Sequence, residues 1–365
     1  MVNSCTSNAD CSNGAVGVLL GNADGTFRFV SSYASAGYQL VSAAVGDFNG
    51  DGHPDLAVIS QCTSSNDCTN GILSVLAGNG DGTFQAAGSF SSGGYQPSSV
   101  AVGDLNADGK PDLLIANSCA SSSGNCLNGE VSVLFGNGDG SFQAASNYAS
   151  DGLNAVSVAV ADLNGDGRLD LVVVNGCDTA FNCGAGGVTV MLGNGDGTFQ
   201  GDPSYPSGGF VTQAVAVGDF NGDGKPDLVV ANYCVGSGGN CANGVIGILL
   251  GKGDGTYEAP AIFSSGGYAT QSVLVGDFNG DGKVDIAVAN LCLSSSSCSN
   301  GGVVSVLLGN GDGTFQQALS YASGGYEAFW LAAGDFNGDG KPDLAVANAC
   351  VSGNNCSNGR VGVFC

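Results

Sequence analysis

The stretch that decides the fold is Gly-Asp-Phe-Asn-Gly-Asp-Gly-His-Pro-Asp-Leu-Ala-Val, at residues 46–58. Its core, Asp-x-Asn-x-Asp-Gly-x-x-Asp, occurs six times at spacings of 57 or 58 residues. A second string, close to Gly-Asn-Gly-Asp-Gly-Thr-Phe, also occurs six times with the same spacings, and pairs of cysteines recur in register with both. Because three motifs share one period, the chain is a repeat protein.

One repeat, residues 41–90, predicts four short strands and no helix. Apolar and β-branched runs at 41–46, 56–60, 72–77 and 84–90 are typical of strands. Asn79-Gly80-Asp81-Gly82 between the third and fourth runs supplies the positive φ angles of a tight hairpin. Four antiparallel strands per repeat predict an all-β fold, a β-propeller of four-stranded antiparallel blades spanning residues 1–365 as one domain. A β-solenoid is the rival, but its coils are usually shorter than this repeat.

Charge and hydropathy limit the function classes. The formal net charge is −24, which argues against nucleic acid and anionic membranes as partners. The sequence shows no apolar stretch long enough to cross a bilayer, so we expect no transmembrane segment. Of 32 acidic residues, 18 lie in the six nine-residue strings, so the charge is concentrated where cations would bind.

The nine-residue strings have the chemistry of calcium loops. Calcium takes six to eight hard oxygen ligands, and alternate residues of a tight loop can turn their side chains onto one ion. Turn formation alone does not explain three acids and an amide in six identical frames. We therefore expect about six structural Ca²⁺ ions. EF-hands are excluded, because they need flanking helices and a glutamate at position twelve, where the first loop has Val58.

The predicted ligands occupy the same five positions of each loop. The side-chain ligands, at positions one, three, five and nine, are Asp47, Asn49, Asp51, Asp55, Asp104, Asn106, Asp108, Asp112, Asp162, Asn164, Asp166, Asp170, Asp219, Asn221, Asp223, Asp227, Asp277, Asn279, Asp281, Asp285, Asp335, Asn337, Asp339 and Asp343. The backbone carbonyl ligands, at position seven, are those of His53, Lys110, Arg168, Lys225, Lys283 and Lys341. The single aspartate of each glycine-rich string is interpreted as a turn residue instead.

Residues 46–58, followed by Gly-Asn-Gly-Asp-Gly-Thr-Phe from residue 78, resemble the FG-GAP/VCBS repeats of integrin α-subunit propellers and many bacterial secreted proteins. The resemblance covers essentially the whole chain. It implies a β-propeller, commonly seven-bladed, with calcium in the loops between the first and second strands of each blade. The cysteine pairs are not part of the common pattern.

Fourteen of the 15 cysteines form seven pairs, with five or six residues between the two members of a pair. The spacing and the lack of nearby ligands do not suit zinc, so we predict disulfides made in an oxidising, extracellular or cell-surface compartment. The predicted pairs are Cys5–Cys11, Cys62–Cys68, Cys119–Cys126, Cys177–Cys183, Cys234–Cys241, Cys292–Cys298 and Cys350–Cys356. Cys365 has no partner in the pattern and is expected to be free or intermolecular.

A four-stranded meander places the acidic loops and the glycine-rich turns on one face, and the cysteine pairs and the Ser-Gly-Gly-Tyr segments on the other. Aromatic residues recur on this second face, at Tyr38, Tyr95, Phe210, Tyr268 and Tyr326. Their rings could stack on a sugar or pack between adjacent blades, and both interpretations stay open.

The sequence offers no set of catalytic residues, so we do not expect an enzyme. The only histidine, His53, lies in an acidic loop, which leaves a Ser-His-Asp triad nowhere to form. The acids outside the repeated strings share no motif that suggests a carboxylate pair for glycoside hydrolysis. The predicted function is an extracellular calcium-binding structural or assembly scaffold. The alternative is a lectin-like or adhesive module that uses the aromatic and disulfide face to bind an extracellular protein or glycan.

The two ends of the chain fall inside a repeat. Seven hairpins of second and third strands favour seven blades, of which the first lacks its inner strand and the last its outer strand; six blades are the alternative. Open blades expose unpaired backbone, which suggests self-association head to tail into filaments. A trimmed or processed chain is the competing explanation of the same ends.

Overall fold

The computed structural model describes residues 2–3, 15–22, 26–64, 67–68, 70–120, 128–177, 186–235, 243–295, 298, 301–350 and 360–364, without the side chains of 202 and 203. All the regular secondary-structure elements within these residues are β-strands. No helix long and apolar enough to span a membrane occurs among them. The predicted all-β class is confirmed.

The strands form seven antiparallel sheets in chain order. The first sheet contains β1 (Val2–Asn3), β2 (Ala15–Gly21) and β3 (Phe27–Ala34). The second and third contain β4 (Tyr38–Gly46), β5 (Asp55–Cys62), β6 (Ile72–Gly78), β7 (Phe84–Ser91), β8 (Tyr95–Gly103), β9 (Asp112–Cys119), β10 (Glu130–Leu134) and β11 (Ser146–Ala149). The fourth and fifth contain β12 (Leu153–Ala161), β13 (Asp170–Cys177), β14 (Gly187–Gly193), β15 (Phe199–Pro206), β16 (Phe210–Gly218), β17 (Asp227–Cys234), β18 (Val245–Leu249) and β19 (Ala261–Ser264). The sixth and seventh contain β20 (Tyr268–Gly276), β21 (Asp285–Cys292), β22 (Val303–Leu307), β23 (Leu319–Ala322), β24 (Tyr326–Gly334), β25 (Asp343–Cys350) and β26 (Arg360–Phe364).

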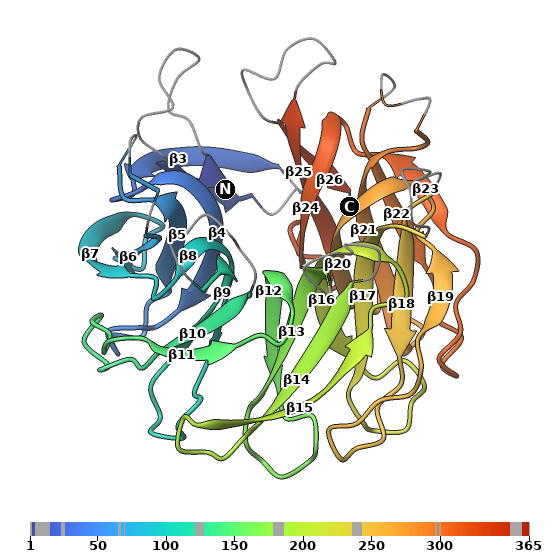
Figure 1. Cartoon of the computed structure of the whole chain (residues 1–365). Helices are drawn as coiled ribbons and strands as arrows, with labels where there is room; N and C mark the ends of the chain where they lie inside the picture. The colour runs from blue at the N-terminus through green and yellow to red at the C-terminus, as the bar shows by residue number, and fades with distance from the viewer. Residues whose placement is uncertain are drawn as a thin grey trace.

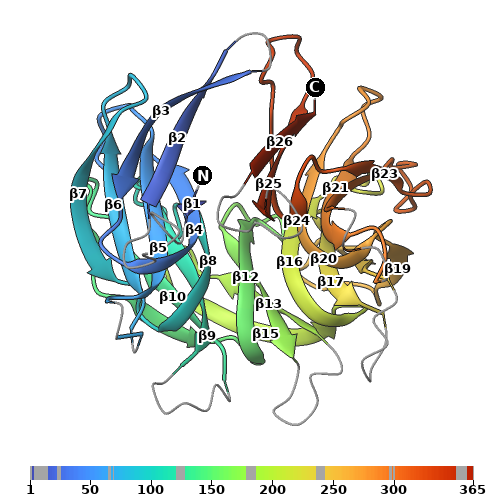
Figure 2. The same cartoon turned by 90° about the horizontal axis from the view of Figure 1, so that it is seen from above.

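The sheets are the blades of a β-propeller, arranged around a ring with the first and last sheets as neighbours (Figures 1 and 2). The rings of Phe27 in the first blade and Phe336 in the last pack edge-on, with their centroids 5.2 Å apart. Phe220 and Phe315 make the equivalent edge-on contact between the fifth and sixth sheets, at 5.7 Å. The contact between the chain's two ends therefore repeats a contact made between consecutive blades.

The six repeats are distributed over five complete blades and two partial ones. Among the described residues, the first sheet has no counterpart of the inner strand β4, and the last has no counterpart of the outer strand β7. This arrangement follows from the offset between the sequence repeat and the blade, and it agrees with the predicted incomplete first and last blades.

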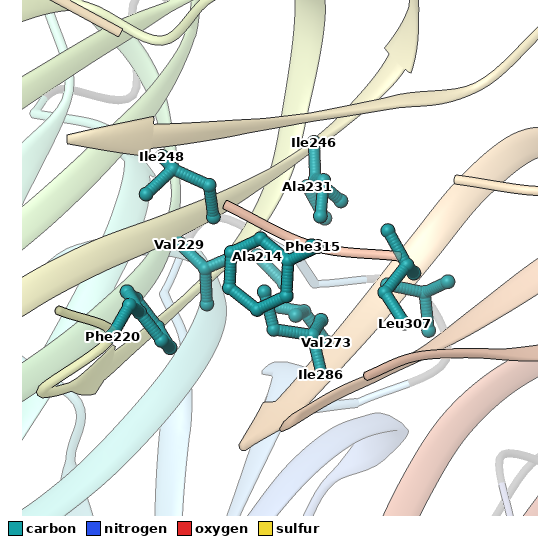
Figure 3. Packing of buried hydrophobic residues seen from close by; sticks show 11 residues of the cluster. Ala214, Phe220, Val229, Ala231, Ile246, Ile248, Val273, Ile286, Leu307 and Phe315 are labelled. Carbon is teal, nitrogen blue, oxygen red and sulfur yellow. The ribbon is translucent and has the colours of Figure 1, made fainter. Parts of the chain in front are cut away.

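The hydrophobic core lies between blades. Second strands are buried on both faces, and all eight residues of β13 are buried. Figure 3 shows one interblade cluster, in which Val229 and Ile248 of the fifth blade pack against Ile286 and Leu307 of the sixth. Because each blade must cover its neighbour's apolar face, β-branched and aliphatic residues fill the second and third strands.

A buried polar pair, which the motif analysis missed, ties consecutive blades together. The Asn232 side-chain amide donates to the Ser207 carbonyl at 3.1 Å, and the Ser207 hydroxyl donates to Asn232 Oδ1 at 2.6 Å. The same reciprocal pair joins Asn175 to Ser150, Asn290 to Ser265 and Asn348 to Ser323. Each serine lies in the connection from the preceding blade, so the pair anchors that connection to the second strand of the next blade.

Glu130 at the start of β10 predicts a pH dependence of stability. Burial raises the pKa of Glu130 to about 7, and its Oε1 atom has no hydrogen-bond partner among the described residues. The unfolded chain releases this proton near pH 4.5, so stability falls as pH rises from about 4.5 to 7. We expect Glu130→Gln to raise the free energy of unfolding at pH 8 by about 1–2 kcal/mol, a value reduced from the full pKa shift because the side chain is partly exposed. At pH 4, where Glu130 is protonated in both states, we expect the variant and the parent protein to be equally stable. Urea unfolding of both proteins at the two pH values measures this, and an equal difference at both would contradict it.

Candidate metal centres

The six acidic loops connect the first and second strands of a blade, and the fifth blade illustrates their geometry. Asp219 at position one accepts backbone N–H groups through both oxygens, from Gly222 at 2.7 Å and from Gly224 at 2.9 Å. The Asn221 side-chain oxygen accepts the N–H of Asp223 at 2.9 Å, and Asp223 accepts the N–H of Lys225 at 3.0 Å. The acids therefore shape the loop themselves, as Asp and Asn do in turns.

The aspartate at position nine has a structural role that the sequence did not reveal. Asp227 is fully buried, and its two oxygens accept the N–H groups of Phe220, at 2.9 Å, and Gly251, at 2.7 Å. Gly251 opens the glycine-rich turn, so this carboxylate fastens the turn to the acidic loop of the same blade. The equivalent carboxylates of the other loops, Asp55, Asp112, Asp170, Asp285 and Asp343, each accept the N–H of the residue after position one.

In four loops the lysine or arginine at position seven forms an ion pair with the aspartate at position five. Lys225 Nζ lies 3.3 Å from Asp223 Oδ2, and Lys110, Arg168 and Lys283 make the same pair at 3.8–3.9 Å. Lys225 also covers the glycine-rich turn, where a Cβ on Gly253 would lie 2.9 Å from its Cδ. From the sequence we predicted a role only for the backbone carbonyl at position seven. The recurrence of Lys or Arg at this position was a signal for the ion pair that the sequence already contained.

Burial and like charge act together on the position-nine carboxylates. Burial raises the pKa of Asp112, and the charges of Asp108 and Asp104 raise it further, while the amides of Gly136 and Leu105 lower it. The same causes raise the pKa values of Asp170, Asp227 and Asp285. The backbone amide of Gly282 is the main cause that lowers the pKa of Asp277 at position one. These four loops thus hold carboxylates close enough to repel one another.

The donor chemistry of the loops fits a hard cation, since carboxylate, amide and carbonyl oxygens are the ligands that calcium prefers. However, no three acidic, histidine or cysteine side chains in the described part of the chain are placed so that they could hold one ion. In four loops the position-five carboxylate pairs with the lysine or arginine at position seven instead. A bound ion would therefore draw this side chain into the loop.

Five aspartates of the glycine-rich strings are turn residues, as predicted, while the sixth, Asp24, lies outside the described residues. Asp81 Oδ1 accepts both the N–H and the hydroxyl of Thr83, at 2.9 and 2.5 Å. The hydroxyl of Thr83 is the main cause that holds the pKa of Asp81 below its usual value. Asp139, Asp196, Asp254 and Asp312 make the same two bonds with the residue two positions on.

Acidic loops also contact the next blade. The Gly313 N–H donates to the Phe220 carbonyl at 2.9 Å, and Gly140 donates to Phe48 at 2.8 Å. Each of these bonds joins an acidic loop to the glycine-rich turn of the following blade. A change in one loop is therefore transmitted to the blade boundary.

The opposite face carries the cysteines and the aromatic residues. Cys62–Cys68 and Cys292–Cys298 are disulfides, which confirms two predicted pairs. Cys119, Cys177, Cys234 and Cys350 are also disulfide-bonded, while their predicted partners Cys126, Cys183, Cys241 and Cys356 lie outside the described residues. Cys5, Cys11 and Cys365 lie outside them too, so the remaining pairing and the fate of Cys365 stay predictions.

The predicted aromatic positions share one structural place. Tyr38, at the first residue of β4, pairs in register with Cys62, and its siblings pair with the first cysteine of their blades. All five side chains are partly buried. Tyr268 packs edge-on against Tyr233 of the preceding blade, with ring centroids 5.9 Å apart. At the junction of the fifth and sixth blades, the predicted aromatic residue Tyr268 thus packs between blades.

Six consecutive segments match the FG-GAP-like repeat, at residues 6–58, 62–115, 119–173, 177–230, 233–288 and 292–346. The chain belongs to this repeat family. A second description, the FG-GAP repeat, matches residues 97–134. The resemblance inferred from residues 46–58 is confirmed.

Curated relatives share part of this chain. Phosphatidylinositol-glycan-specific phospholipase D of Rattus norvegicus is 33% identical over 156 residues, which are 36% of this chain and 18% of the relative. The Mus musculus enzyme is 32% identical over 151 residues, 36% of this chain and 17% of the relative. The similarity thus spans less than a fifth of these enzymes.

Solved structures show the same fold at low identity. A putative 6-phosphogluconolactonase from Bacteroides uniformis has a TM-score of 0.57 at 13% identity, covering 92% of this chain and 89% of the other. A protein from Lactobacillus plantarum has a TM-score of 0.56 at 14% identity, with the same coverage. At this identity the likeness concerns the fold alone.

Proposed function

We propose that this chain is an extracellular calcium-binding β-propeller that serves as a structural scaffold and is not an enzyme. The observation that carries the proposal is the sixfold loop, in which hard oxygen donors and mutually repelling carboxylates recur in one frame. A divalent ion relieves that repulsion, and calcium tolerates the irregular coordination that such loops offer better than magnesium does.

Two further observations support an extracellular scaffold. Disulfides persist in oxidising compartments, and two are formed within single blades, on the face opposite the acidic loops. The single histidine lies in an acidic loop and leaves general acid–base chemistry without its most common side chain. Head-to-tail assembly into filaments, predicted from the sequence, stays a prediction.

Native mass spectrometry of the full chain with calcium, magnesium and chelator tests the proposal. We expect about six retained calcium ions, displaced by chelator and only partly replaced by magnesium. The same spectra report whether the protein is monomeric or assembled. Retention of no calcium at millimolar concentrations would contradict the metal sites, whereas monomers that retain calcium would contradict only the assembly.

A further inference from the structure

A cavity of about 240 Å³ lies where the third blade meets the fourth, on the face opposite the acidic loops. Its lining includes Asp151, from the connection before β12, and residues of β13, β14 and β15, which lie side by side in Figure 1. On the same volume measure one water needs only about 10–15 Å³, so the cavity has room for a small organic molecule.

The cavity exists because the fourth blade departs from the repeat at Gly187. The same place in the other blades carries Ala15, Ile72, Glu130, Val245, Val303 and Arg360. A Cβ on Gly187 would meet no atom of the described residues within 4 Å, and its φ is not in the left-handed region. Its neighbour Gly186 differs, because a Cβ there would collide with Thr212 Oγ1. Packing therefore requires glycine at 186 but not at 187, and the observed consequence of Gly187 is open space.

Asp151 is a second departure at the same cavity. The corresponding residues of four other connections are Gly93, Gly208, Gly266 and Gly324, all with positive φ. Asp151 adopts the same left-handed conformation, φ 53°, which is unfavourable for a residue with a side chain. Its carboxylate lies over β15, with Oδ2 3.8 Å from the place of a Cβ on Gly201. The left-handed backbone at residue 151 thus favours glycine, but the sequence has an aspartate there, and its carboxylate lies at the rim of the cavity.

The floor of the cavity is polar and already ordered. Thr189 Oγ1 donates to the Ser150 carbonyl at 2.7 Å and lies 3.3 Å from Ser204 Oγ. The Asn175 amide is held by Ser150. Gly187 pairs in register with Pro206, which adds apolar C–H surface beside these hydroxyls. Among the described residues that line the cavity there is no cationic side chain, so an anionic ligand would face Asp151 without compensation.

We propose that this cavity binds one neutral pyranose sugar. A pyranose combines ring hydroxyls with apolar C–H faces, which matches the mixed lining, and its size suits the volume. The Asp151 carboxylate accepts hydrogen bonds from sugar hydroxyls, the Ser204 hydroxyl adds a donor and acceptor, and the sugar's C–H face lies against Gly187 and Pro206. This site goes beyond the scaffold role and uses none of the predicted aromatic residues.

Saturation-transfer NMR on the calcium-loaded full chain, with free glucose, galactose, mannose and N-acetylglucosamine as probes, tests the site. Gly187→Val installs a residue that two sibling blades carry and fills the cavity. We expect it to weaken the binding of the best probe by at least roughly tenfold without changing the melting temperature. Asp151→Gly restores the repeat residue, so we expect a similar loss of binding, of roughly 10- to 100-fold, with equal or higher stability.

Ser204→Ala and Ser89→Ala form a matched pair, since the two serines occupy the same place in β15 and β7. The first is expected to weaken binding and the second to leave it unchanged. No transfer from any probe at about 20 mM, or equal binding by Gly187→Val and the parent protein, would overturn the proposal. Binding that Ser89→Ala weakens as much as Ser204→Ala would do the same.

Discussion

Asp227→Ala is expected to destabilise the protein strongly even when calcium is absent. The Asp227 side chain is fully buried, and it is the acceptor for the N–H groups of Phe220 and Gly251. Removing it leaves two backbone donors without that partner, at about 1–3 kcal/mol each. We expect a loss of about 3–5 kcal/mol in the free energy of unfolding, measured by urea denaturation in chelator.

Asp223→Ala in the same loop is the control. Asp223 is exposed, and its ion pair with Lys225 is of the surface kind that contributes about 0–1 kcal/mol. Removing it also relieves repulsion with neighbouring carboxylates, so we expect a change below about 1 kcal/mol in chelator. In calcium, by contrast, both variants are expected to lose the ion of this loop.

The comparison separates two roles of one loop. If Asp227 acts only as a metal ligand, the two variants will have the same stability in chelator. If it also fastens the glycine-rich turn, they will differ by several kcal/mol there. Asp227→Asn, which keeps one acceptor oxygen, is expected to fall between Asp227→Ala and the parent protein.

The sequence predicted the propeller because the repeat is periodic at two scales. The 57- or 58-residue period defined the blade, and the alternation of apolar runs with Asn-Gly and Asp-Gly turns defined its four strands. The structure places the strands of the second blade within a few residues of that expectation, for example β6 at Ile72–Gly78. Local turn chemistry and burial agree here, so little depends on distant contacts.

The roles of individual polar residues could not be predicted in the same way. Position nine was interpreted as a ligand because its residue type fits calcium. Its carboxylate also accepts backbone N–H groups, one from its own loop seven residues away and one from a turn 24 residues away. The Asn232 partner Ser207, 25 residues away, likewise lies in the connection from the preceding blade. Such roles depend on which backbone groups the fold buries nearby. The recurring Asn two residues before a cysteine was a signal that could have been used.

Chelation of calcium is expected to lower the melting temperature by about 10–20 °C. Each ion that binds only the folded state adds RT ln(1 + [Ca]/Kd), or about 2.7 kcal/mol when calcium is a hundredfold above Kd. Several calcium loops stabilise the same propeller, so their contributions add. Each kcal/mol of stability moves the melting temperature of a large domain by a few degrees or less. Circular dichroism melting in calcium and in chelator measures the shift.

The alternative explanation of such a shift is screening, because 32 acidic residues would respond to any added cation. Sodium chloride at the same ionic strength distinguishes the two, and we expect it to restore only a small part of the lost stability. Magnesium is expected to restore less than calcium, since it gives up its water ligands reluctantly. Asp223→Ala should then remove only the part of the calcium-dependent stabilisation that one loop contributes, because stability in a repeat array is spread over its units. Full recovery in sodium chloride would mean that the loops act only as repelling charges, and it would remove the basis for six specific calcium sites.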